Sequence, residues 1–389
     1  MALPGEDAAC FSGFQAQYIK FCNGDTSVYI FTYAEEDFIR GSAQCLDDDA
    51  LSRFDKILRS KWQEKMERGF FKYHLGELQT RILPGSRHFV AQLNIQRGAL
   101  RRKPQEIQSI KQVFDPSQFN FNKIKSGEIL FEIQREGHCR RCDFDYNGVI
   151  CDKILFVINV SPLEFCHSLI VPYPELCLPQ ILTMDAIRIG IESVLLSSDP
   201  GFRVGFNSLG AFASVNHLHL HCYYLNHRLL LEGTPAVPLS PHHNFYFLPD
   251  FPPGFLFYTD GDDLERLVDR IWKITQVFVE KDIAHNMFIT RGCQPDHHRC
   301  DTFLVRSGIR IVLWPRMSCF GAKEESAFNV ALCELAGHLP FKNRKDFEST
   351  TEETVIQIIK KYLLPENQFF QLQSELLKVF DTQEAPSSV

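Results

Sequence analysis

The sequence predicts an α+β fold with a mainly antiparallel sheet and flanking helices. In the centre of the chain, two predicted strands are followed by an amphipathic helix and then by two further strands. The same order of elements recurs in the next part of the chain, which indicates a duplicated module. A doubly wound parallel sheet would instead alternate single strands with single helices. We therefore expect two fused modules of related architecture.

Composition narrows the class of protein. The chain has 389 residues, of which 44% are hydrophobic and 23% are charged, as in ordinary globular proteins. A net charge of −7 argues against general binding to nucleic acid or to an anionic membrane. Neither a signal peptide nor a membrane-length apolar run is visible. Thirteen scattered cysteines favour reduced thiols and a cytoplasmic protein.

The elements of the first module follow from local patterns. Apolar residues at helical spacing predict a helix from Leu51 to Arg68, and an amphipathic helix is expected from Gln180 to Leu196. The polar, Pro-containing stretch from Arg97 to Gln118 predicts a long connection. Strands ahead of the histidine-rich segment discussed below are expected at Gly69–Tyr73, His88–Asn94, Ile154–Val160, His167–Pro172 and Arg203–Asn207.

The second module repeats this order. A helix from Asp262 to Asp282 carries one apolar stripe. Strands are expected at Phe245–Leu248, Phe255–Tyr258, Asn286–Thr290 and Ile309–Trp314. The last of these strands contains no histidine, so this copy is expected to be degenerate. Two further helices, Thr351–Leu364 and Gln368–Val379, follow.

These patterns give the expected domain boundaries. We predict an N-terminal extension (1–50), a catalytic half (51–240), a degenerate half (241–348), C-terminal helices (349–380) and a disordered tail (381–389).

The most informative segment runs from Asn216 to Tyr224, where His217, His219 and His221 alternate with apolar residues. Side chains two residues apart share one face of a strand, so the three imidazoles are expected on one face. The apolar residues Leu218, Leu220 and Cys222 should then lie on the buried face.

Such a row of imidazoles has two chemical uses. Three histidines and a water would form a hydrolytic zinc site, although the local sequence points to no fourth ligand. Clusters at His138–Cys142 and His297–Cys300 match no standard zinc module. Alternatively, a neutral imidazole attacks phosphorus when its other ring nitrogen is held as a donor. A merely structural role is disfavoured by the strict alternation beside Asn207, Ser214 and Asn216.

The segment His217–Tyr223 resembles the His-φ-His-φ-His-φ-φ signature of the histidine-triad (HIT) superfamily. Asn159–Pro162, His167–Pro172, Asn207 and Ser214–Val215 resemble the nucleotide-binding strands of that superfamily, in the same order. Over roughly residues 50 to 350 the chain further resembles the GDP-hexose phosphorylases, which include plant GDP-L-galactose and animal GDP-D-glucose phosphorylases. The segments that carry this likeness are Trp62–Tyr73, Phe89–Asn94, Lys103–Glu106, Phe119–Lys123 and Asn207–Ala213.

The resemblance implies two HIT-like halves in one chain, as in galactose-1-phosphate uridylyltransferase. It also implies a nucleotidyltransferase that converts GDP-glucose and phosphate to glucose 1-phosphate and GDP by double displacement. No cofactor and no catalytic metal are expected. The oligomeric state and the residues that recognise guanine are left open.

The resemblance also implies roles for individual residues. His219 is the expected nucleophile, which forms a guanylyl-histidine, and the main-chain carbonyl of His217 orients its ring. At the third position His221 departs from the Gln of the plant enzyme and matches the hydrolytic HIT proteins. The other expected contacts are Asn159 with the ribose hydroxyls, Ser214 and Asn207 with the phosphates, and His167 in the same pocket.

Two alternative functions are carried forward. One is a HIT-type nucleotide hydrolase that releases GMP, and His221 slightly favours it. The other is a non-catalytic guanine-nucleotide-binding or exchange protein, which the intact histidines disfavour.

Overall fold

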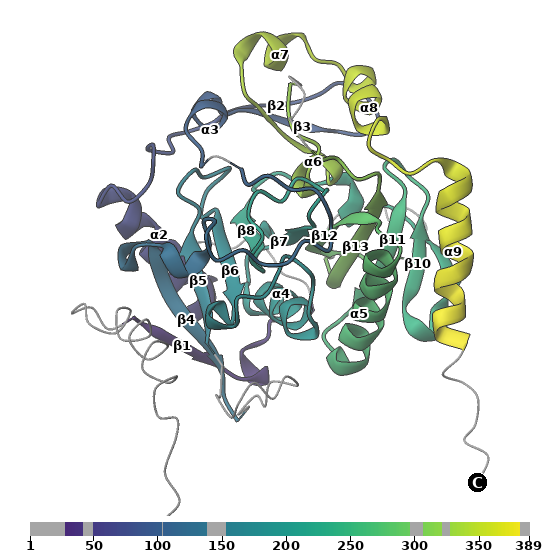
Figure 1. The fold of residues 1–389 in the computed structure, drawn as a ribbon, viewed down its shortest axis with the longest axis horizontal. Helices are drawn as coiled ribbons and strands as arrows, with labels where there is room; N and C mark the ends of the chain where they lie inside the picture. Colours follow the sequence, from purple (N-terminus) through teal and green to yellow (C-terminus); the bar gives the residue numbers. More distant parts are fainter. Residues whose placement is uncertain are drawn as a thin grey trace, which may run out of the picture.

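The structure, a computed structural model, describes residues 28–41, 50–102, 104–137, 153–295, 306–320 and 327–381. Within these ranges one large sheet runs through the molecule (Figure 1), with antiparallel neighbours except at one edge, where β1 and β4 are parallel. Its strands, in lateral order, are β1 (Ile30–Tyr33), β4 (Ile129–Arg135), β5 (Ile154–Ile158), β6 (Ser168–Pro172), β8 (Leu220–Tyr224), β7 (Phe202–Asn207), β12 (Ala284–Gly292), β13 (Gly308–Arg316), β11 (Gly254–Thr259), β10 (Phe245–Leu248) and β9 (Val237–Ser240).

The order of these strands shows the predicted repetition. The first module runs β5, β6, α4 (Met184–Leu196), β7, β8, and the second runs β10, β11, α5 (Leu264–Glu280), β12, β13. In each module the last strand along the chain lies between the second and third strands: β8 lies between β6 and β7, and β13 lies between β11 and β12. The two modules meet where β7 pairs antiparallel with β12. The predicted α+β class with a mainly antiparallel sheet is confirmed.

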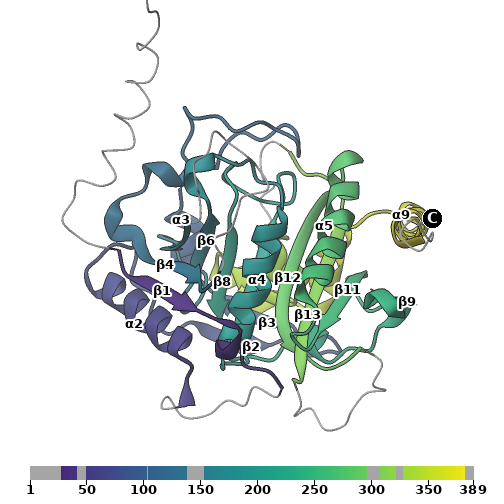
Figure 2. The same cartoon turned by 90° about the horizontal axis from the view of Figure 1, so that it is seen from below.

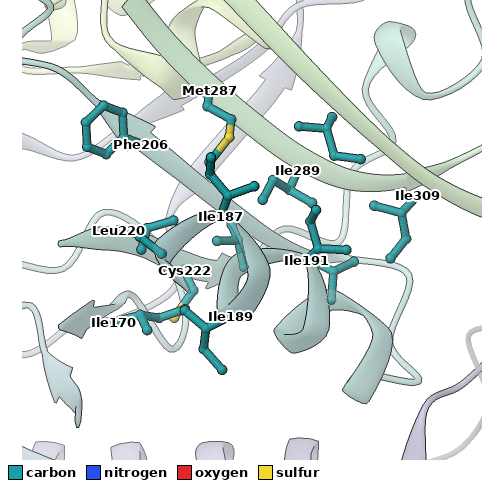
Figure 3. Packing of buried hydrophobic residues seen from close by; sticks show 14 of the residues in the cluster. Ile170, Ile187, Ile189, Ile191, Phe206, Leu220, Cys222, Met287, Ile289 and Ile309 are labelled. Carbon is teal, nitrogen blue, oxygen red and sulfur yellow. The ribbon is translucent and has the colours of Figure 1, made fainter. Parts of the chain in front are cut away.

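Helices α4 and α5 pack side by side on one face of the sheet (Figure 2). The side chain of Thr183 caps α4 by accepting the N–H of Ala186, so the helix begins a few residues later than the predicted Gln180. Figure 3 shows Ile187 and Ile191 of α4 grouped with side chains of the sheet, such as Ile289. Burying each such side chain contributes about 1.5–3 kcal/mol.

Two further helices cover the ends of the sheet. Helix α2 (Arg53–Glu67) turns Phe54 and Trp62 into the core beside the first module. Helix α9 (Glu366–Asp381) lies beside β10 and β11 (Figure 1), where Phe369 stacks on Phe255 with ring centroids 4.8 Å apart.

A small sheet forms a separate layer with several short helices (Figure 1). Its strands are β2 (Gln79–Ile82), β3 (Val90–Leu93) and β14 (His338–Phe341), and the helices are α3 (Ile95–Ala99), α6 (Leu332–Leu335), α7 (Arg344–Ser349) and α8 (Glu352–Lys360). Its apolar residues share one core cluster with Phe288, Val312 and Trp314 of the second module. Because β14 lies far along the chain from β3, this layer joins distant segments.

Most predicted elements are present, but the strand expected at Gly69–Tyr73 is wrong. Gly69 adopts a left-handed φ of 71° after α2 and turns the chain. The next residues bond individually to the loop after β5: Lys72 N–H donates to the Val160 carbonyl, and the Tyr73 hydroxyl donates to the Pro162 carbonyl. Individual hydrogen bonds to loop carbonyls therefore replace the regular hydrogen bonding of a strand pair.

The described residues include only part of the two ends of the chain. Part of the expected extension, Ile30–Tyr33, is the edge strand β1, while residues 1–27 and 42–49 lie outside the described ranges. The tail beyond Asp381 also lies outside them.

Candidate active site

The three histidines enter the structure differently from one another. Strand β8 begins at Leu220, so only His221 lies within it, and the prediction of one strand carrying all three was wrong. The reason lies in the backbone partners: the N–H of Leu218 donates to the Leu178 carbonyl at 2.9 Å rather than to a neighbouring strand. The apolar residues of the segment are buried, as predicted: Leu218, Leu220 and Cys222.

Gln180 replaces the missing strand partner of His219. Its side-chain oxygen accepts the N–H of His219 at 2.9 Å, and its side-chain nitrogen donates to the His219 carbonyl at 3.0 Å. The same nitrogen lies 3.0 Å from the carbonyl of Asn207. Gln180 is buried, so these contacts hold the His219 backbone in place. No motif in the sequence marks this residue.

One pocket collects six of the seven predicted site residues: Asn159, His167, Asn207, Ser214, His219 and His221. His217 is the exception. Its side chain is fully buried behind the pocket and does not line it.

His219 is held as a neutral imidazole with one free nitrogen. Its Nδ1 lies 2.8 Å from the carbonyl oxygen of His217, an acceptor, so Nδ1 carries the proton. Burial lowers the pKa of His219 to about 4, and the bond to the His217 carbonyl opposes this shift only in part. At neutral pH the Nε2 lone pair is therefore available for attack.

His221 has the opposite tautomer, set by a relay through His167. The N–H of Leu163 donates to His167 Nδ1 at 2.8 Å, so the proton of neutral His167 is on Nε2. That nitrogen lies 3.1 Å from His221 Nδ1, which must accept. Burial lowers the pKa of both histidines well below the usual value. His221 therefore carries its proton on Nε2 and offers an N–H.

Phe121 contacts both His217 and His219. Its main-chain N–H donates to His217 Nδ1 at 3.0 Å. Its ring centroid lies 5.4 Å from the imidazole of His217 and 5.1 Å from that of His219. Burial lowers the pKa of His217 to about 4, so this imidazole is neutral too.

Asn207 connects the two modules at the pocket. Its side-chain oxygen accepts the Nδ2–H of Asn286 at 2.7 Å and the N–H of Leu332 at 3.0 Å. Because that oxygen is occupied, the group that Asn207 offers to a ligand is its Nδ2 donor.

The pocket differs in character from one end to the other. Around Phe121 its lining is largely apolar, with side chains that also pack together: Phe119, Phe121, Leu169 and Val215. Arg102, which is paired with Glu128, lies over the Phe119 ring at this end. Beyond His221 and His167 it is cationic and polar: Arg97, Arg101, Lys342, Asn329, Glu334 and Tyr223. No sequence motif marks this second group, because its residues come from distant segments of the chain.

In the described part of the chain, no three His, Cys, Asp or Glu side chains converge as a metal-binding group. The clusters His138–Cys142 and His297–Cys300 lie outside the described residues. No helix in the described ranges has the length and apolar character of a membrane span.

Comparison with solved structures supports the fold. The yeast Ap4A phosphorylase Apa2, solved in complex with Ap4A, aligns with a TM-score of 0.51 and 15% identity, over 81% of this chain and 98% of that one. A second structure of the same enzyme gives a TM-score of 0.52 and 14% identity. At such identity the likeness shows a shared fold alone.

Comparison of sequences identifies the family. GDP-D-glucose phosphorylase 1 of Danio rerio is 60% identical over 91% of this chain and 99% of its own length. The Homo sapiens protein of that name is 49% identical over 93% of this chain and 94% of its own length. GDP-L-galactose phosphorylase 2 of Arabidopsis thaliana is 27% identical over 81% and 74%. The family GDPGP1-like, N-terminal domain matches residues 53–223, and GDPGP1-like, C-terminal domain matches residues 236–383. This chain belongs to the GDPGP1-like family, together with the animal GDP-D-glucose phosphorylases.

Proposed function

We propose that this protein is a GDP-hexose phosphorylase that converts GDP-glucose and phosphate to glucose 1-phosphate and GDP. The names of the animal relatives support the substrate. The observation that carries the chemistry is the bond between His219 Nδ1 and the His217 carbonyl, which leaves Nε2 as a free nucleophile in the pocket.

In the first step, His219 Nε2 attacks the α-phosphorus of GDP-glucose. The bond between this phosphorus and the oxygen bridging to the β-phosphate breaks, and glucose 1-phosphate leaves with the electron pair. The imidazole gains positive charge as the N–P bond forms, and the His217 carbonyl stabilises the charge through Nδ1–H. We assign the Nε2–H of His221 as a donor to the phosphoryl oxygens, a role that its tautomer supports.

In the second step, an oxygen of inorganic phosphate attacks the same phosphorus. The N–P bond breaks, GDP forms and His219 returns to its neutral tautomer. Each step inverts the configuration at phosphorus, so the complete reaction retains it.

The remaining pocket residues receive roles consistent with this chemistry. We assign Asn159 to the ribose hydroxyls, Ser214 and Asn207 to the phosphates, and His167 to the orientation of His221. The catalytic half is assigned to residues 51–240 and the degenerate half to 241–348, followed by the helices of 349–380. On its thiol content we assign the enzyme to the cytoplasm, with small-molecule partners.

Product analysis tests the proposal. With phosphate present, the protein should release GDP and glucose 1-phosphate, and replacing His219 by Ala should reduce turnover by about a thousandfold or more. Normal turnover of GDP-glucose by the His219→Ala protein would refute the assignment.

Hydrolysis is the second candidate, because the imidazole of His221 stands where the plant enzyme has Gln. Water would then replace phosphate in the second step, and the product would be GMP. If GMP dominates even with saturating phosphate, the protein is a hydrolase; if GDP dominates, it is a phosphorylase.

A further inference from the structure

The parallel pairing of β3 with β14 brings basic residues from distant segments together. Leu93 lies opposite Phe341 in the register, and the N–H of Asn94 donates to the Phe341 carbonyl at 2.9 Å. Both strands end at this edge of the small sheet. Helix α3, which carries Arg97, therefore begins beside Lys342.

A glycine allows α3 to approach Lys342 closely. A Cβ at Gly98 would lie 3.0 Å from the Cβ of Lys342. Arg97 and Arg101 stand on either side of this contact in the sequence, and both line the active-site pocket together with Lys342. Arg97 is oriented by a bond to the Ser161 carbonyl, and the Lys342 ammonium lies 3.0 Å from Asn329 Oδ1.

Three basic side chains and one carboxylate line this end of the pocket: Arg97, Arg101, Lys342 and Glu334. Partial desolvation and the charge of Arg97 lower the pKa of Arg101. Desolvation and the charge of Arg101 lower the pKa of Lys342, and the charge of Glu334 opposes this shift. Within the described residues, Arg101 has no ion pair. The nearby Glu334 accepts the N–H of Ala331, and burial raises the pKa of its carboxyl group. The site therefore favours a bound anion.

A buried hydroxyl supports this conclusion. Tyr223 lines the pocket, is fully buried, and its OH has no hydrogen-bond partner within the described part of the chain. Burial raises its pKa well above the usual value, so the OH stays protonated and able to donate. An oxygen-rich ligand at this end would satisfy it.

We propose that Arg97, Arg101 and Lys342 form one phosphate subsite that is used in both half-reactions. It holds the β-phosphate of GDP-glucose in the first step and inorganic phosphate in the second. This inference rests on the proposed function. In a double displacement at one phosphorus, the acceptor must enter from the side on which the leaving group departed, so a single anion site serves both. By concentrating phosphate at the adduct, the site favours phosphate over water.

The test compares Arg101→Gln and Lys342→Gln with a matched control. Lys345→Gln removes a nearby exposed lysine of α7 that does not line the pocket. With GDP-glucose saturating, the KM for inorganic phosphate should rise by roughly tenfold or more in each pocket variant, because a charge-assisted contact is lost. The share of GMP among the products should rise as well. The control should match the wild type in both.

A parallel incubation without phosphate separates the possible failures. Both pocket variants should form guanylyl-His219 more slowly than the wild type, because the subsite also holds the β-phosphate of GDP-glucose. Adduct formation on prolonged incubation would show that His219 and the fold are intact. If the wild type forms no adduct, the proposed function itself fails. If adducts form but both variants keep the wild-type KM for phosphate, the phosphate subsite is refuted.

Discussion

Main-chain groups set different tautomers on His219 and His221, the two histidines of the triad that line the pocket. The His217 carbonyl holds the proton of His219 on Nδ1, whereas the Leu163 N–H, acting through His167, places that of His221 on Nε2. One imidazole therefore offers a free lone pair on Nε2, and the other offers an N–H at the same position. Two chemically identical side chains differ in hydrogen-bonding capacity because of their neighbours.

Replacement of His221 by Gln tests its role as a donor. The Gln side-chain amide also offers an N–H, so activity should remain within about tenfold of the wild type. His221→Phe keeps an aromatic ring but offers no donor, so its kcat should fall further, by about a hundredfold or more. Steady-state kinetics with GDP-glucose and phosphate measure both. Equal loss in the two variants would show that the donor is not what matters.

Replacement of Gln180 tests the support of the nucleophile. Gln180→Leu leaves the buried N–H and carbonyl of His219 without partners, each at a cost of about 1–3 kcal/mol. We expect a lower free energy of unfolding and a reduced kcat, with little change in the KM for GDP-glucose. Gln180→Glu retains the acceptor for the N–H and should recover part of the kcat. An unchanged kcat in Gln180→Leu would show that the contacts of Gln180 with His219 do not affect catalysis.

The sequence predicts site residues unevenly. His219, His221 and Asn159 belong to a local pattern and were found to share a pocket. Gln180 acts through its side chain on a backbone far along the chain, which leaves no periodic signal. Lys342 reaches the pocket only through strand pairing in the small sheet, and residue spacing does not encode that pairing.

At the scale of elements, the pairing of β7 with β12 joins the two modules. Gly205 of β7 lies opposite Phe288 in this pair. A Cβ there would lie 2.8 Å from the Met287 carbonyl oxygen and 2.9 Å from a methyl of Leu332. Strand pairing and the packing of α6 therefore both require a residue without a side chain at this position.

Substitution of Gly205 by Ala should weaken this junction. The backbone must shift to admit the methyl group, so the free energy of unfolding should fall by about 1–3 kcal/mol. Gly76→Ala is the control, because its Cβ would meet nothing within 4 Å. Chemical denaturation compares the two. If the two variants were equally stable, the pairing of β7 with β12 would tolerate a side chain at position 205.

Strands with strong apolar patterns were predicted well, and those with competing contacts were not. The segments at Ile154–Ile158 and Phe202–Asn207 pair with strands on both sides, and their patterns predicted them. Gly69–Tyr73 has a similar composition but bonds to single carbonyls of a loop. Likewise, Gln180 rather than a strand satisfies His219. The pattern of apolar residues predicts which side chains are buried. It does not predict which groups the backbone bonds to, because that choice depends on tertiary contacts.

At the scale of the whole molecule, buried neutral histidines make stability depend on pH. Burial lowers the pKa of these side chains: His167, His217, His219, His221, His285 and His338. For His219 and His285 the pKa is lowered to about 4. In the unfolded chain a histidine titrates near about 6.5. Unfolding therefore takes up protons between these values.

The free energy of unfolding should be nearly constant above about pH 7 and should fall as the pH drops from about 6.5 towards about 4. Each such histidine contributes a loss of up to about 1.4 kcal/mol per pH unit in this window. Chemical denaturation at about pH 7.5, 6 and 5 measures the trend. His285→Phe removes one titrating group away from the pocket and should reduce the slope. A flat profile between about pH 7 and pH 5 would contradict the burial of neutral imidazoles.

The proposed mechanism depends on a covalent guanylyl-His219 intermediate. The purified protein is incubated briefly with GDP-glucose in the absence of phosphate, and the intact mass and the peptides are then measured. We predict one guanylyl group on the peptide that contains His219, its absence in the His219→Ala protein, and its conversion to GDP when phosphate is added. No adduct on the wild type, or an adduct on a residue other than His219, would contradict the double-displacement mechanism.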